Sequence, residues 1–196
     1  MQYPILFNRD EIIDWAAKHH ANVRLADTID ASRPGGGPWL HEALAHGGVF
    51  HDLPGFTLNE VFRELIGRLP LPQETDRELL IQMMTARERA HSTGLGNGIA
   101  IPHVQSPLVL PLAQPLASLA FLRQPLDWNA RDGKLVYCLF TIISPNTFDH
   151  LALLARVANS LQDPGCLACH QDRASAPDLL AAYRALETRE QHPEKD

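Results

Sequence analysis

The segment Ser92-Thr-Gly-Leu-Gly-Asn-Gly-Ile-Ala-Ile-Pro-His103 joins a glycine-rich loop to a short apolar run that ends in proline and histidine. A helix is predicted before this segment and a short strand within it, at Ile99-Ala-Ile101. A dinucleotide-binding fingerprint needs the opposite order, with a strand before the glycines and a helix after them. No Gly-Lys-Ser/Thr follows, so a nucleotide P-loop is excluded as well. Taken alone, the glycines indicate a turn with positive φ angles.

Two helices are predicted before this segment. Thr57-x-x-Glu60 is a capping box, and apolar residues follow it at helical spacing until Pro70. Thr75-x-x-Glu78 caps a second helix, which runs to about Arg89. The inward face of this second helix is predicted to consist of Leu79, Leu80, Met83 and Met84.

Two strands and two further helices are predicted after it. Leu116–Leu122 and Leu135–Ile143 are apolar, as in strands buried on both faces, and a tight turn at Arg131–Lys134 precedes the second. Ser144-Pro-Asn-Thr147 opens a helix that Asp163-Pro-Gly165 closes. Ser175-x-x-Asp178 opens the last helix of the chain. This alternation predicts an α/β fold, a mixed β-sheet flanked by helices, with an N-terminal appendage.

The chain divides by composition into three parts. Residues 1–55 contain Pro34-Gly-Gly-Gly-Pro38 and other turn signals, with one helix expected at Arg9–His19, and are predicted to form the appendage. Trp15 and Trp39 are expected to anchor the appendage onto the domain. Residues 56–187 form the domain, and residues 188–196 form a charged tail that frays from about Glu187.

The overall composition excludes several classes of protein. The 196 residues are 45% hydrophobic, enough for one domain, but the longest apolar run, Val136–Ile143, is too short to cross a membrane. A net charge of -6 opposes binding to nucleic acid. Three cysteines and the lack of a leader sequence favour a cytoplasmic location.

Two histidines occupy positions suited to phosphate chemistry. His103 follows a proline at the end of a strand, where the backbone is rigid and the imidazole can face solvent. His150 lies in the first turn of a helix, where free N–H groups and the helix dipole favour an anion. On spacing alone, both can equally be ordinary, partly exposed histidines.

Three motifs together resemble a known family. They are Arg87-Glu-Arg-Ala-His-Ser-Thr-Gly-Leu-Gly-Asn-Gly-Ile-Ala-Ile-Pro-His103, Asp127-Trp-Asn-Ala-Arg-Asp-Gly133 and His150-Leu-Ala-Leu-Leu-Ala-Arg156. In this order they resemble the enzyme IIA domain of the fructose/mannitol class of the sugar phosphotransferase system, including its nitrogen-regulatory members. The resemblance covers about Phe56 to Leu186.

The resemblance implies a role for each matching residue. His103 matches the phosphorylated histidine, His150 the second active-site histidine, and Arg87 the arginine that supplies positive charge. Neutral imidazole, with an ordinary pKa of about 6.5, is a competent nucleophile near neutral pH. The phosphate-binding groups are predicted to be the backbone N–H groups of Val104 and Gln105 together with Gly96, Asn97 and Gly98. The chemistry requires no metal and no cofactor.

The implied partners are a histidine phosphocarrier protein as donor and a IIB domain or a regulatory target protein as acceptor. Members of the family often have a glycine, or a valine and then an arginine, after the phosphorylated histidine, whereas this chain has Val104 and Gln105. The missing positive charge, and the lack of a IIB or membrane domain among these residues, favour regulation over sugar uptake. The alternatives are a regulatory binding module with little turnover and the sensor part of a DNA-binding regulator.

Three other patterns in the sequence have a functional and an ordinary interpretation. Cys166-Leu-Ala-Cys169-His170 spells a c-type haem attachment motif, which needs an oxidising compartment, and a redox or zinc role for the cysteines is a further alternative. The scattered histidines of residues 19–51 lack the spacing of a metal site. Leu6–Ala17 resembles the closing helix of excisionase-type helix-turn-helix domains, but the helices that enter a groove would lie before Met1, so DNA binding is not predicted.

Overall fold

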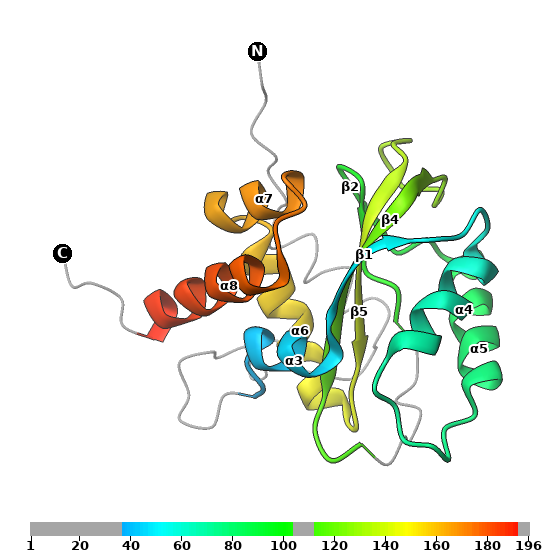
Figure 1. Cartoon of the computed structure of the whole chain (residues 1–196), viewed down its shortest axis with the longest axis horizontal. Coiled ribbons are helices and arrows are strands. Elements are labelled where there is room, and N and C mark those ends of the chain that lie inside the picture. The colour runs from blue at the N-terminus through cyan, green and yellow to red at the C-terminus, as the bar shows by residue number, and fades with distance from the viewer. Residues whose placement is uncertain (1–36, 104–111, 192–196) are drawn as a thin grey trace. The chain divides into compact units, whose positions relative to one another are not determined.

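The structure is a computed structural model that describes residues 37–103 and 112–191 (Figure 1). These residues belong to two compact units: residues 43–146 form one, and residues 37–42 together with residues 147–191 belong to the other. The helix expected at Arg9–His19, Trp15 and the helix-turn-helix resemblance all lie outside the described residues.

A mixed five-stranded sheet forms the centre of the unit of residues 43–146. Its spatial order is β1-β4-β5-β3-β2. The strands are β1 (Val49–Leu53), β2 (Gly94–Gly96), β3 (Ile99–Ala100), β4 (Leu116–Leu126) and β5 (Val136–Ile143). β4 and β5 are antiparallel, β1 is parallel to β4, β3 is parallel to β5, and β2 is antiparallel to β3. The predicted α/β class with a mixed sheet flanked by helices is confirmed.

The two central strands follow the apolar runs of the sequence. Seven consecutive residues of β4, from Leu116 to Leu122, are buried, and all of β5 except Tyr137 is buried. Such strands have no solvent face, so they show no alternation of polar and apolar residues. β4 continues to Leu126, past the predicted end, because its exposed last residues still reach Val136 of β5.

Two helices, α4 (Leu58–Arg68) and α5 (Arg77–Ala90), cover one face of this sheet (Figure 1). Thr57 caps α4 as predicted, since its hydroxyl accepts a hydrogen bond from the N–H of Glu60 at 3.3 Å. The cap of α5 differs from the prediction. Asp76, not Thr75, accepts from the N–H of Leu79 at 2.9 Å. Thr75 is instead buried in the turn before the helix.

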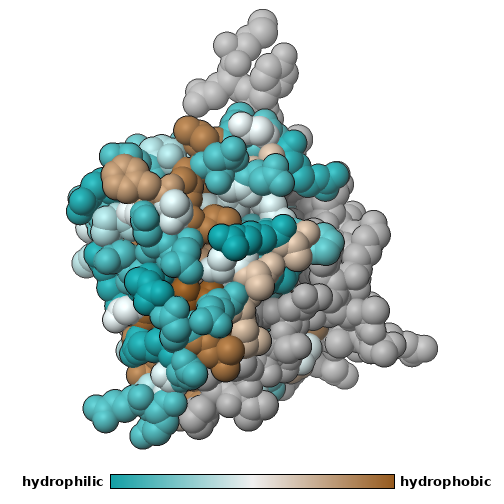
Figure 2. All heavy atoms as spheres, turned by 90° about the vertical axis from the view of Figure 1, so that its right-hand side faces the viewer, coloured by the Kyte–Doolittle hydropathy of each residue, from teal (hydrophilic) through white to brown (hydrophobic). Residues whose placement is uncertain are grey.

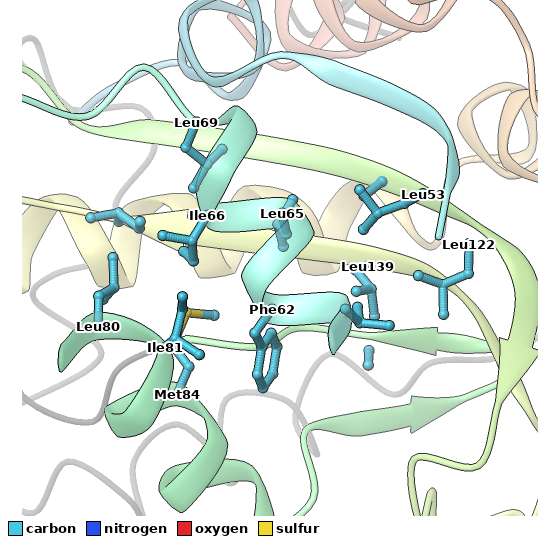
Figure 3. Packing of buried hydrophobic residues seen from close by; sticks show 14 of the residues in the cluster. Leu53, Phe62, Leu65, Ile66, Leu69, Leu80, Ile81, Met84, Leu122 and Leu139 are labelled. Carbon is cyan, nitrogen blue, oxygen red and sulfur yellow. The ribbon is translucent and has the colours of Figure 1, made fainter. Parts of the chain in front are cut away.

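The core of this unit lies between the helix pair and the sheet. Figure 3 shows Phe62, Leu65 and Ile66 of α4 packed beside Leu80 and Met84 of α5, above Leu122 and Leu139 of the strands. Further members of the cluster are Leu53, Val61, Leu69, Ile81, Trp128 and Val136. Leu79, predicted to face inward, is 45% exposed on the outer face of α5, and Ile81 takes an inward position.

The opposite surface of the helix pair is mainly hydrophilic, with small apolar patches between the polar groups (Figure 2). On it, Arg63 of α4 donates two hydrogen bonds to Glu78 of α5, at 2.7 and 2.9 Å. This pairing explains why Glu78 does not act in the predicted capping box: its carboxylate binds the neighbouring helix instead.

Residues 40–53, which the sequence analysis assigns to the appendage, form regular structure. α3 (Leu40–Gly47) leads into β1, which is an edge strand of the sheet and pairs with β4 from Val49 to Leu53. A Cβ atom at Gly47 would collide with the carbonyl oxygen of Ala117, so glycine permits the end of α3 to approach β4 closely. The sheet therefore begins before the predicted boundary at residue 56.

The other unit consists of α6 (Thr147–Ser160), α7 (Pro164–Gln171) and α8 (Ala176–Gln191), together with residues 37–42. Asp163 was predicted only to close the helix before it. In the structure its carboxylate also caps α7, accepting from the N–H of Cys166 at 2.9 Å, with Pro164 as the first helical residue. The predicted start of α8 at Ser175 is confirmed, because its hydroxyl accepts from the N–H of Asp178.

Candidate functional site

His103 lies just beyond β3 and continues its direction. It forms an isolated parallel bridge with Ile142 of β5, so its backbone is fixed to the centre of the sheet. The imidazole turns back along its own strand, and Nδ1 lies 2.8 Å from the carbonyl oxygen of Ile101. The residue is 1% exposed. The expectation of a solvent-facing ring is therefore wrong, since this hydrogen bond holds the side chain against the sheet.

The bond to Ile101 decides which nitrogen of His103 carries the proton. A carbonyl oxygen only accepts hydrogen bonds, so Nδ1 must carry the proton. In the neutral ring Nε2 then holds the free electron pair. Pro102 strengthens the arrangement because its ring restricts the backbone between the carbonyl group and the histidine. The geometry thus assigns the proton to Nδ1 and the lone pair of the neutral ring to Nε2.

Arg87 lies in the last turn of α5, in the same unit as His103. It is buried, and its Nη1 donates a hydrogen bond to the carbonyl oxygen of His91, the C-cap residue, at 2.6 Å. Burial lowers the pKa of the guanidinium from its ordinary value of 12.5, while the adjacent Glu88 raises it. An arginine in this environment still carries its charge at neutral pH.

Glu88, the residue after Arg87, is a buried group that the sequence analysis did not single out. Its carboxylate accepts hydrogen bonds from both the backbone N–H and the hydroxyl of Thr93, the latter at 2.6 Å. Burial raises the pKa of Glu88, and the hydrogen bonds from Thr93 oppose the rise. A signal was present in the sequence: Glu88 continues the i, i+4 series of Leu80 and Met84 on the apolar face of α5.

The second motif, Asp127–Gly133, holds the connection between α5 and β2. Trp128 is buried, and its ring meets that of Phe62 edge-on with centroids 5.6 Å apart. The backbone carbonyl of Trp128 accepts a hydrogen bond from the hydroxyl of Ser92 at 2.6 Å. This motif therefore stabilises the segment that leads to Thr93.

The predicted phosphate-binding turn, Gly96-Asn97-Gly98, closes the β2–β3 hairpin at the end away from His103. Asn97 and Gly98 both have positive φ angles, 52° and 80°, as a tight two-residue hairpin turn requires. The backbone N–H of Asn97 donates to the carboxylate of Asp132 at 2.7 Å, and Lys134 binds the Asn97 side chain. These contacts give the turn a structural task, and its role in binding phosphate stays a prediction.

The remaining predicted site residues lie in the other unit or outside the described residues. His150 is buried in the first turn of α6, which also contains Asp149. It belongs to the unit of residues 147–191, whereas Arg87 and His103 belong to the unit of residues 43–146. Val104 and Gln105 fall outside the described residues. The structure thus describes Arg87 and His103 in one unit, and the participation of His150 stays a prediction.

The Cys166-x-x-Cys169-His170 pattern lies on α7. Cys166 and His170 are buried one helical turn apart, and Nε2 of His170 is hydrogen-bonded to the hydroxyl of Tyr183 in α8. Burial raises the pKa of the Cys166 thiol to about 12 and lowers that of His170 to about 4. An inaccessible thiol and an engaged imidazole fit haem attachment poorly, and a thiol held protonated is a poor metal ligand.

The chain is similar to known proteins over most of its length. A family model described as "Phosphoenolpyruvate-dependent sugar phosphotransferase system, EIIA 2" matches residues 43–179. The chain belongs to this family. The match begins within α3 and so includes β1, in agreement with the structure. It contains Arg87, His103 and His150 together.

Individual relatives include regulatory members. The chain is 32% identical to the "Nitrogen regulatory protein" of Pseudomonas aeruginosa over 152 residues, which cover 75% of this chain and 94% of that protein. The structure resembles the nitrogen regulatory protein IIA-Ntr from Neisseria meningitidis with a TM-score of 0.62 and 25% identity, over 73% of this chain and 97% of that one. It shares its fold with IIA mannitol in the Escherichia coli complex with phosphorylated IIB mannitol, with a TM-score of 0.56, 17% identity, and 70% and 94% coverage.

Within residues 37–103 and 112–191, no helix is both long and apolar enough to cross a membrane. In the same ranges no three His, Cys, Asp or Glu side chains are grouped so that they could hold a metal ion.

Proposed function

We propose that the chain is a phosphoryl carrier of the phosphotransferase system, with Nε2 of His103 as the acceptor atom. One observation carries this proposal, the hydrogen bond between Nδ1 of His103 and the carbonyl oxygen of Ile101 at 2.8 Å. It leaves the Nε2 electron pair to attack phosphorus. The N–P bond of the donor phosphohistidine breaks as the new N–P bond forms, and the proton on Nδ1 stays in place.

In this proposal, Arg87 and His150 stabilise the phosphoryl group. A phosphoryl transition state requires mainly positioning and neutralisation of charge. Arg87 is a buried cation in the unit that contains His103, and His150 would donate an N–H to a phosphoryl oxygen. The N–H groups of Val104 and Gln105 would complete the binding site.

A regulatory role is part of the proposal. It is supported by the relatives named nitrogen regulatory protein. His103 is 1% exposed, so transfer requires that Nε2 become accessible to the carrier. The proposed donor is a histidine phosphocarrier protein, and the acceptor is a IIB domain or a regulatory target, all in the cytoplasm.

Mass spectrometry under conditions that preserve N–P bonds tests the acceptor. After incubation with phosphoenolpyruvate and the general phosphotransferase proteins, the wild type should gain the mass of one acid-labile phosphoryl group. His103→Ala, and the bulkier His103→Gln if the alanine variant does not fold, should gain none. His150→Ala should be labelled more slowly or fail in onward transfer. His51→Ala, which removes an exposed imidazole on β1, is the control and should label like the wild type.

Labelling of His103→Gln at the rate of the wild type would overturn the acceptor assignment. The role as a carrier, and not only as a binding module, is decided by whether labelled protein passes its phosphoryl group to a IIB partner. A protein that keeps the label and changes its affinity for a target would support the regulatory alternative.

A further inference from the structure

The carboxylate of Glu88 is placed at the end of α5 with both oxygens bound. One accepts the backbone N–H of Thr93 and the other accepts the Thr93 hydroxyl. Glu88 is 4% exposed and Thr93 2%. Burying a carboxylate costs free energy unless it is fully hydrogen-bonded. The two bonds satisfy it and close the short connection between α5 and β2 around a single side chain.

A continuous series of hydrogen bonds leads from this carboxylate to the reactive ring. The carbonyl oxygen of Thr93 accepts the backbone N–H of Ile101 at 3.1 Å. The carbonyl oxygen of Ile101 then accepts Nδ1–H of His103 at 2.8 Å. Each bond fixes the residue that makes the next one, so the position of the Ile101 carbonyl depends on where Thr93 is held.

β3 is also held by its pairing with β5, and His103 by its bridge to Ile142, but neither contact holds Thr93. β2 and β3 are only three and two residues long, and their pairing has an irregular register between Gly94 and Gly96. Short antiparallel ribbons are marginally stable by themselves. At the end of the hairpin nearest His103, the Glu88 carboxylate is the group that ties Thr93 to α5.

We propose that Glu88 is a positioning residue for the phosphoacceptor: through Thr93 and Ile101 it holds His103 in the form with the proton on Nδ1 and the electron pair on Nε2. Its effect on phosphoryl acceptance rests on the proposed function, whereas its effect on the tautomer does not. Glu88 does not touch the reacting atoms, so it acts on their orientation.

Ring nitrogen chemical shifts of His103, recorded by long-range proton–nitrogen NMR on the full unphosphorylated chain, test the proposal directly. At roughly pH 8, above the ordinary imidazole pKa, they report the tautomer. The wild type should be in the Nδ1–H form. Glu88→Gln and Thr93→Val each remove one of the paired interactions and should shift the population toward the Nε2–H form. Thr93→Ser keeps both donors and should restore the wild-type spectrum.

Glu78→Gln is the matched control, because it makes the same chemical change on the exposed face of the same helix. It should leave the His103 tautomer unchanged. We expect acceptance of phosphoryl groups to fall about tenfold in Glu88→Gln, the effect of one lost buried hydrogen bond. The same rate is expected for Thr93→Ser and Glu78→Gln as for the wild type.

The proposal is overturned if Glu88→Gln and Thr93→Val are folded, as judged from their backbone amide spectra, and keep the wild-type tautomer of His103. A general loss of structure would alter many resonances and would not be restored by Thr93→Ser, so it is distinguishable from a local effect. If the wild type accepts no phosphoryl group, the proposed function fails, but the tautomer measurement still decides the role of Glu88.

Discussion

Two buried imidazoles in this chain have different environments. Nδ1 of His103 is hydrogen-bonded to a backbone carbonyl, which fixes the proton on Nδ1. Nε2 of His170 is bonded to the Tyr183 hydroxyl within the helical unit, and burial lowers the pKa of His170 to about 4. The first arrangement sets the tautomer of the ring. The second holds a neutral ring inside the protein and makes stability depend on pH.

His170 should destabilise the protein in mild acid. Its pKa is about 4 in the folded chain and ordinarily 6.5, so between these values the unfolded chain binds more protons and stability falls as the pH falls. The full loss is about 3 kcal/mol. Chemical denaturation of the wild type and of His170→Gln, at about pH 7.5 and about pH 4.5, measures it.

His170→Gln should lose less free energy of unfolding between these two pH values than the wild type does. His51→Gln, which removes an exposed imidazole, should lose as much as the wild type. Equal losses in the wild type and in His170→Gln would show that His170 is not the group responsible.

At the scale of the elements, the N-cap residue of α5 differs between the sequence prediction, Thr75, and the structure, Asp76. Asp76→Ala removes the acceptor for the N–H of Leu79 and should lower the free energy of unfolding by about 1 kcal/mol. Thr75→Val should cost little, because the Thr75 hydroxyl is buried and caps nothing among the described residues. Chemical denaturation curves of the two variants distinguish the two caps. A larger loss of the free energy of unfolding in Thr75→Val than in Asp76→Ala would support Thr75 as the cap.

Elements with a strong apolar pattern were predictable, and those that depend on context were not. The helix from Leu58 and the two central strands follow their patterns closely. β1 was missed because its five residues pair with β4, a strand more than sixty residues away in the sequence. α7 was missed because Asp163-Pro164 ends one helix and begins the next, and both uses have the same sequence signal.

In the candidate site, too, local features were predictable and those that depend on the folded context were not. The spacing and the resemblance placed His103 at a strand end, as observed, but not the inward direction of its ring. That direction depends on the bridge to Ile142 and on the carbonyl of Ile101, which only the folded sheet supplies. Glu88 was overlooked because a charged residue on a helix usually faces solvent. Its position on the apolar stripe of α5 was the available sign.

At the scale of the whole chain, a residue near the C-terminus holds the start of the described structure. Glu187 of α8, predicted to begin the frayed tail, is 3% exposed. Its carboxylate accepts the backbone N–H groups of Leu40 and His41, at 2.7 and 3.2 Å, and so caps α3. It also lies 3.5 Å from Nη1 of Arg156, whose guanidinium stacks on the ring of Trp39. Trp39 thus anchors residues 37–42, as the sequence suggested.

Glu187→Ala should therefore destabilise the protein far more than a tail substitution would. It leaves two helix N–H groups without their acceptor and removes the closer carboxylate from buried Arg156, a combined loss of about 3 kcal/mol in the free energy of unfolding. Glu190→Ala is the matched control. Glu190 is the second-to-last residue of α8, is more exposed than Glu187 and is 3.8 Å from Arg156, so its removal should cost about 1 kcal/mol or less. Urea denaturation compares the two variants, and equal losses would mean that the Glu187 carboxylate contributes no more to stability than the more exposed Glu190 does.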